Sequence, residues 1–142
     1  MQAKVNRQPV WYYYYIYRGT YSVSDAMSRT TNDYGVTHAC NAFFVVDTQY
    51  LHPTTITDDI KMQRMLTDFW VSFATNEVSN IGGVQWPRLN PNEKLFHYLY
   101  IAGSDKIQMG KSINFDQRDF WNSVNFNENK LYTASDILRE EL

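Results

Sequence analysis

The first strong signal along the chain is a segment near its start that is apolar or aromatic at every position. After Pro9, residues 10–17 read Val-Trp-Tyr-Tyr-Tyr-Tyr-Ile-Tyr. A run without polar alternation is typical of a strand that is covered on both faces, as in the parallel sheets of α/β proteins. The pattern therefore predicts that residues 9–17 form a strand of an α/β sheet.

The second strong signal is an amphipathic helix that begins near Thr57 and ends near Asn76. Thr57 suits an N-cap, and the acidic Asp58 and Asp59 suit the positive end of a helix dipole. Apolar residues then recur every three to four positions: Ile60, Met62, Met65, Leu66, Phe69, Trp70 and Phe73. This spacing predicts one buried helical face.

The remaining segments carry weaker patterns. The apolar run at 39–46 is short enough for a strand or a buried helix, and periodicity does not decide between them. Residues 95–101 predict a second strand that ends at Gly103, whereas 117–126 and, more weakly, 131–142 predict helices. Polar residues, glycine and proline predict loops at 18–33, 47–55, 80–83 and 86–92.

Composition and charge limit the classes of function. The 142 residues, 44% of them hydrophobic, fit one domain with a core. A net charge of -2 gives no general attraction to nucleic acid or to anionic membranes. No apolar run approaches the roughly 18 residues that span a bilayer, and residues 1–8 lack the apolar stretch of a signal peptide.

The aromatic residues are unevenly distributed. They make up 16% of the chain, with 11 tyrosines, and they concentrate in the segment 9–17. So short a chain cannot easily cover such a strand on both faces. We therefore expect this strand to belong to a larger sheet.

His38 is the best candidate site residue. It ends the loop segment Gly35-Val36-Thr37-His38, which follows the aromatic segment along the chain. Loops after the strands of open α/β sheets are where these folds place their chemistry. Three nearby carboxylates are candidates to orient its imidazole, although solvation in a loop accounts for each equally well: Asp25, Asp33 and Asp47.

Other kinds of chemistry lack the residues they need. No serine stands between glycines in the Gly-x-Ser-x-Gly pattern of α/β hydrolases. Cys40 is the one cysteine, and a buried structural thiol is the expected role for it. The histidines at 38, 52 and 97 have no metal-ligand spacing, and Gly82-Gly83 follows a helix rather than a strand, unlike a phosphate-binding loop. No metal and no cofactor are predicted.

Several of these segments, taken in order, resemble the C-terminal part of a type-B carboxylesterase. This family includes the insect esterases, the juvenile hormone esterases and the cholinesterases, and the insect esterase branch is the most similar. Any one match is weak, but together they are specific. The matching segments are 9–19, 35–38, 65–74, 86–87, 95–101 and 118–122.

The resemblance implies an α/β-hydrolase fold, of which residues 1–142 would be a C-terminal fragment with an incomplete mixed sheet and packing helices. Segment 9–17 would be the last core strand before the catalytic histidine. His38 would be the base of a Ser-His-acid triad in carboxylic ester hydrolysis. Phe120 and Trp121 would anchor the terminal helix against the sheet.

The sequence departs from the family in two respects. The family's serine, its glycine-rich oxyanion loop and its acidic triad member all lie upstream of the part represented here. In addition, the family usually has an acid two or three positions after the histidine, where this chain has Cys40 and Asn41. A triad histidine without its nucleophile cannot hydrolyse esters, so we expect the chain alone to be inactive.

Three interpretations remain open. The chain is a piece of a carboxylesterase that acts on small-molecule esters, or a non-catalytic, cholinesterase-like adhesion protein with a protein partner. The third interpretation is a small independent α/β domain, against which the unsupported aromatic strand argues. Retention of His38 favours the esterase, and Asn41 favours the adhesion protein.

Family resemblance also predicts the compartment. Type-B carboxylesterases mostly enter the secretory route, which implies secretion or retention in the endoplasmic-reticulum lumen. Residues 139–142 read Arg-Glu-Glu-Leu, similar to the Lys-Asp-Glu-Leu retrieval signal, although an ordinary charged helix end explains them equally well.

Overall fold

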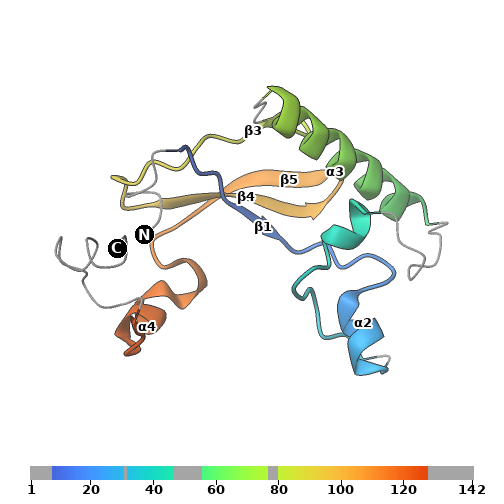
Figure 1. Cartoon of the computed structure of the whole chain (residues 1–142), viewed down its shortest axis with the longest axis horizontal. Coiled ribbons are helices and arrows are strands. Elements are labelled where there is room, and N and C mark those ends of the chain that lie inside the picture. The colour runs from blue at the N-terminus through green and yellow to red at the C-terminus, as the bar shows by residue number, and fades with distance from the viewer. Residues whose placement is uncertain (1–7, 31, 47–55, 77–79, 128–142) are drawn as a thin grey trace, which may run out of the picture.

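The computed structural model describes residues 8–30, 32–46, 56–76 and 80–127, and its centre is a three-stranded mixed sheet (Figure 1). The strands are β1 (Tyr13–Tyr15), β4 (Phe96–Gly103) and β5 (Lys106–Ser112), in the order β1-β4-β5. β1 runs parallel to β4, and β4 runs antiparallel to β5. The predicted strands at 9–17 and 95–101 are therefore present, but β1 is much shorter than predicted. The sequence analysis predicted no strand at β5.

The helix α3 (Thr57–Asn76) lies across one face of this sheet, with the bounds that the periodicity predicted (Figure 1). Side chains alternate across a strand, so Tyr13 and its register partner Leu99 share the face that α3 covers. The buried core combines α3, this face of the sheet and two neighbouring segments: Phe44, Met62, Leu66, Phe69, Ile81, Trp86, Leu99 and Ile101.

No long helix covers the opposite face of the sheet in the described part of the chain, although Phe115 packs on it. Tyr12 and Tyr14 of this face are 39% and 44% exposed. Their rings contact other aromatic side chains of the same face, such as Phe96 and Tyr98, at centroid distances of 4.9 and 6.2 Å. Within the described residues α3 covers one face of the aromatic strand, as expected for a chain too short to cover both. That the strand belongs to a larger sheet stays a prediction.

The segments between β1 and α3 adopt short helices. Residues 42–44 form a 3-10 helix, η1 (Ala42–Phe44), which decides the ambiguous apolar run against a strand. A short helix, α2 (Val23–Ser28), occupies part of the predicted loop at 18–33. Ser22 and Asp25 form a capping box at its start, a local signal that the loop prediction did not use.

The predicted loop at 80–83 is wrong, because these residues belong to a small hairpin. β2 (Asn80–Ile81) pairs antiparallel with β3 (Val84–Gln85). Gly82 and Gly83 connect them with φ values of 57° and 79°, the left-handed conformation that two-residue hairpin turns require. Ile81 is buried against α3 and the sheet, so the hairpin closes one end of the core.

The C-terminal helix is shorter than predicted and packs differently. It comprises the 3-10 turn η2 (Phe115–Gln117) and α4 (Arg118–Ser123), because Asp116 and Gln117 have φ values of 51° and 55° and break the helix. Phe120 and Trp121 are 55% and 50% exposed, so the prediction that they anchor this helix on the sheet is wrong. Phe115 makes that contact instead, with its ring 4.5 Å from that of Tyr98. The helix predicted at 131–142 lies outside the described residues.

Candidate functional site

His38 lies in a turn that follows an extended segment, and its side chain is exposed. We call residues 34–41 the His38 loop. Gly35 has a φ of 75°, and Ala39, directly after the histidine, has a φ of 69°. Positive φ is uncommon for a residue other than glycine, so neighbouring contacts must hold this turn in place. Two such contacts, made by Cys40 and Asn41, lie immediately after the histidine.

Cys40 holds the His38 loop from its buried side. It is 1% exposed and free, which confirms the prediction of a buried thiol. The Thr37 backbone N–H donates to Cys40 Sγ at 3.3 Å, and the Thr37 hydroxyl lies 3.4 Å from the same sulfur. Burial alone would raise the pKa of this thiol, but hydrogen bonds from Thr37, Val23 and Ser22 outweigh it and lower the pKa. The Cys40 sulfur thus links Thr37, which precedes His38, to Ser22 and Val23 at the start of α2.

Asn41 ties the same loop to the sheet. Its side-chain Nδ2 donates a 2.8 Å hydrogen bond to the hydroxyl oxygen of Tyr13 in β1. Tyr13 packs against the core with its ring, so its position is well determined. Asn41 is one of the two residues that stand where the resembled family usually has an acid. Its amide anchors the His38 loop to β1.

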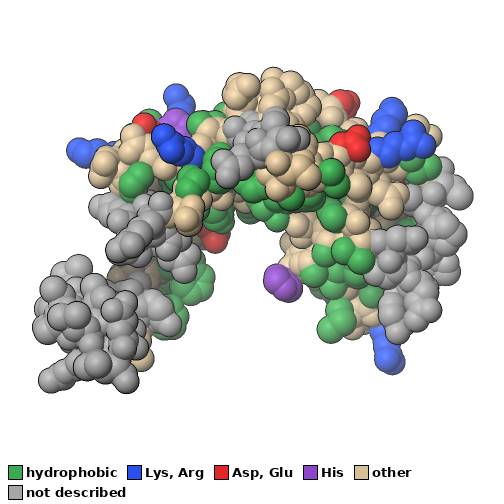
Figure 2. Space-filling model, turned by 45° about the horizontal axis from the view of Figure 1, so that its top comes forward, with side chains coloured by type: hydrophobic (Ala, Val, Ile, Leu, Met, Phe, Trp, Pro, Cys, Tyr) green, Lys and Arg blue, Asp and Glu red, His purple; other side chains and the backbone are tan. Residues whose placement is uncertain are grey.

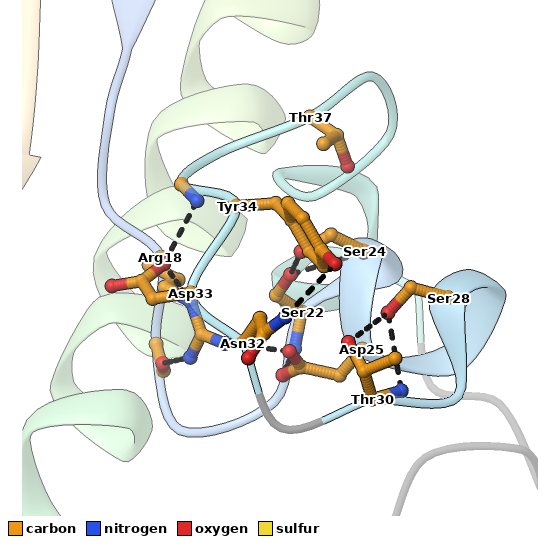
Figure 3. A network of polar contacts seen from close by, with 12 residues as sticks. Arg18, Ser22, Ser24, Asp25, Ser28, Thr30, Asn32, Asp33, Tyr34 and Thr37 are labelled. Carbon is orange, nitrogen blue, oxygen red and sulfur yellow. Dashed lines mark hydrogen bonds and ion pairs between the residues drawn. The ribbon is translucent and has the colours of Figure 1, made fainter.

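A cluster of ion pairs holds the beginning of the loop, as Figure 3 shows. Arg18 Nη2 lies 2.6 Å from Asp25 Oδ1, and Arg18 Nε lies 2.9 Å from Asp33 Oδ1. The same Asp33 oxygen accepts a 2.8 Å hydrogen bond from the Gly35 backbone N–H. Asp25 and Asp33 thus pair with Arg18 rather than with His38, so the idea that either one orients the imidazole is wrong. The third candidate, Asp47, lies outside the described residues.

The imidazole of His38 has no hydrogen-bond or ion-pair partner among the described residues. Within the described residues, its position is therefore set by the backbone of the turn. The nearby hydroxyls of Ser22 and Ser24 are buried and bonded to each other, which leaves neither poised as a nucleophile for His38.

The other histidines do not join this site. His97, in β4, has its Nε2 3.2 Å from Glu93 Oε2, and His52 lies outside the described residues. Within residues 8–30, 32–46, 56–76 and 80–127, no three His, Cys, Asp or Glu side chains gather as metal ligands would. No described helix is both long and apolar enough to cross a membrane.

Sequence reasoning singled out His38 as a candidate site residue and Cys40 as a buried thiol, but it missed the residues that hold their loop. The capping-box spacing of Ser22 and Asp25 was the one local signal available. Arg18 and Tyr13 gave none, because each acts through partners that lie 7 to 28 positions away.

Comparison with known proteins identifies the relatives of this chain. The profile of the family described as "Carboxylesterase family" matches residues 1–121. A protein named "Carboxylic ester hydrolase" from Bombus ignitus is 43% identical over 132 residues, which cover 92% of this chain and 24% of the relative. "Venom carboxylesterase-6" from Apis mellifera is 41% identical over the same shares of each chain. "Liver carboxylesterase B-1" from Rattus norvegicus is 25% identical over 78% of this chain and 19% of the relative.

The chain spans about a quarter of the length of the two insect relatives. All three relatives carry esterase names, so the adhesion interpretation gains no support from them.

Proposed function

Because this chain belongs to the carboxylesterase family, we propose that it is the C-terminal part of a serine carboxylesterase and supplies its catalytic base, His38. Family membership implies an α/β-hydrolase fold, with which the mixed sheet and its covering helix are compatible. The nucleophilic serine, the oxyanion donors and the triad acid would come from the rest of the enzyme.

The observation that carries this proposal is the contrast between the His38 side chain and its surroundings. The residues that follow it are fixed to the core, through the buried Cys40 and through Asn41 on Tyr13. The imidazole itself is exposed and unpaired within the described part of the chain. A ring on a held backbone with both nitrogens free is what a triad needs, because one nitrogen faces the serine and the other faces the acid.

In this role His38 would take the proton of the serine hydroxyl as that oxygen attacks the ester carbonyl. It would then give the proton to the leaving alcohol, and repeat the exchange with water to release the acid. Within the described residues nothing supplies the nucleophile, so the 142-residue chain alone would not turn over a small-molecule ester.

The exposed aromatic residues of the sheet support the view that more protein packs here. β1 is an edge strand of the described sheet, and Tyr12 and Tyr14 project from the face that α3 does not cover. Soluble proteins normally cover or charge such an edge. One matched relative is named as a venom protein, so we place this esterase in the secretory route as well.

The test uses an esterase as long as the matched relatives, with residues 1–142 as its C-terminal part. His38→Ala should lower kcat/KM for p-nitrophenyl acetate by at least about a thousandfold, because triad members act as a unit. Lys61→Ala, a substitution of an exposed side chain on α3, should leave activity unchanged. Full activity in the His38→Ala enzyme would refute the assignment.

The isolated chain provides the second arm of this test. Purified residues 1–142 should hydrolyse the same ester no faster than their His38→Ala variant. Rapid hydrolysis that depends on His38 would contradict the idea that the nucleophile lies elsewhere.

A further inference from the structure

A small pocket is lined by residues between 87 and 97 and by Arg118, far along the chain from the His38 loop. It has a volume of about 170 Å³, below the roughly 300–1,000 Å³ typical of sites for drug-sized ligands. Its walls come from the segment after Trp86, the start of β4 and the start of α4: Pro87, Arg88, Leu89, Asn90, Glu93, Lys94, Leu95, Phe96, His97 and Arg118. Figure 2 shows Lys, Arg and His side chains gathered at the left end of the molecule, where the loop before β4 lies in Figure 1.

The first wall is held in place by backbone hydrogen bonds. The Leu89 N–H donates to the Val10 carbonyl at 2.7 Å, which ties this segment to the residues before β1. A tight turn follows, in which the Glu93 N–H donates to the Asn90 carbonyl at 3.2 Å. The Asn90 side chain also accepts a 3.1 Å hydrogen bond from the Asn92 N–H.

The second wall reaches the pocket through aromatic packing. The ring of Phe115 lies 5.3 Å from that of Phe96 and 4.5 Å from that of Tyr98, so η2 rests on the start of β4. Arg118 begins α4 directly after η2. This packing brings Arg118 to the same pocket as Arg88 and Lys94, although it lies 24 positions after the nearer of them in the sequence.

The charges of the pocket do not balance. Glu93 is the one acid among its lining residues, and both of its oxygens are occupied. Asn90 Nδ2 donates to Oε1 at 3.0 Å, and His97 Nε2 lies 3.2 Å from Oε2. The three cations Arg88, Lys94 and Arg118 form no ion pair with any described residue.

We propose that this pocket binds a phosphate or sulfate group, either as the free ion or as the end of a small monoester. Three cations from two segments line the pocket without an ion-pair partner among the described residues and offer the charge, and the two guanidinium groups offer the forked donors that suit such oxyanions. The apolar lining residues Pro87, Leu89 and Leu95 would face the organic part of a monoester.

The experiment is calorimetric titration of residues 1–142, carried on a soluble fusion partner, with the partner alone as the blank. Inorganic phosphate and sulfate should each bind saturably, whereas chloride at equal ionic strength should not. Phenyl phosphate distinguishes the two sources of the group: tighter binding than phosphate assigns a monoester, and equal binding assigns the free ion. If none of the three probes, phosphate, sulfate and phenyl phosphate, binds saturably, the proposal is refuted.

Variants connect any binding to this pocket. Arg118→Gln should weaken phosphate binding about threefold to fivefold, as expected for one exposed charge pair. The triple variant Arg88→Gln/Lys94→Gln/Arg118→Gln should bind no phosphate. Arg64→Gln, which removes an exposed cation of α3, is the matched control and should bind like the parent chain.

The Glu93→Gln variant tests whether misfolding, rather than the loss of charge, weakens phosphate binding in the other variants. It keeps the size of the Glu93 side chain and one acceptor oxygen but removes the one negative charge, so it should strengthen phosphate binding by about twofold to fivefold. A damaged fold cannot produce this gain. Unchanged affinity in the triple variant would refute the site.

Discussion

At the scale of single residues, Asp59 joins the main helix to the chain that leaves the sheet. Its carboxylate is 2% exposed and lies in the first turn of α3, where the helix dipole favours negative charge. It accepts a 2.5 Å hydrogen bond from the Tyr17 hydroxyl and a 3.0 Å bond from the Thr20 N–H. Burial and the bond to Asp59 both raise the pKa of the Tyr17 phenol, so the phenol remains a donor at neutral pH.

We expect Asp59→Ala to lower the free energy of unfolding by about 3 kcal/mol, because it leaves two donors without their acceptor. Protease resistance of the chain displayed on yeast measures this without purification. Asp58→Ala is the matched control, since the Asp58 side chain is 76% exposed and pairs only weakly with Lys61 at 3.6 Å. It should change stability by less than about 0.5 kcal/mol. Equal effects of the two substitutions would show that the buried carboxylate has no special role.

At the scale of elements, the hairpin of β4 and β5 depends on a glycine opposite a tyrosine. Gly110 is the register partner of Tyr98, and a Cβ at position 110 would overlap the Tyr98 ring. Because Gly110 has no side chain, the Tyr98 ring can lie across β5, and there it contacts the ring of Phe115. The small residue in β5 thus determines how the C-terminal segment packs on the sheet face opposite α3.

Gly110→Ala should destabilise the chain by about 1–3 kcal/mol, as overpacking typically does. In a Tyr98→Ala background the same change should be neutral or stabilising, since alanine is otherwise the better residue in a strand. Protease resistance of all four chains gives a double-mutant cycle. Additive effects would mean that the Tyr98 ring does not lie over Gly110.

At the scale of the whole molecule, the described chain covers one face of its sheet with a long helix and the other only in part. α3 covers the upper face in Figure 1, whereas α2 and α4 lie below the sheet at opposite ends. The aromatic lower face between them carries exposed Tyr12 and Tyr14. Exposed apolar area of this kind marks an interface or promotes aggregation.

The chain expressed alone should therefore be poorly soluble. Tyr12→Lys together with Tyr14→Lys should raise the soluble fraction several-fold, as measured by centrifugation and immunoblotting. The control places the same charges at apolar positions away from this face, Met27→Lys with Val71→Lys, and should bring little gain. A soluble parent monomer with a sharp, reversible thermal transition would contradict the prediction.

The sequence by itself determined the features that depend on neighbours along the chain. The periodicity of residues 57–76 was enough for α3, because a helix and its buried face repeat within a few residues. The position of His38 in a loop and the burial of Cys40 were likewise readable from composition and order.

The tertiary structure decided what depends on residues far apart. Which face of β1 is covered, the pairing of Arg18 with Asp25 and Asp33, and the anchoring of α4 by Phe115 rather than Phe120 all follow from the packing of distant segments. Local patterns state that a side chain is apolar or charged, but they do not state what it meets. The physical reason is that each contact depends on how the backbone folds back on itself, which no window of neighbouring residues contains.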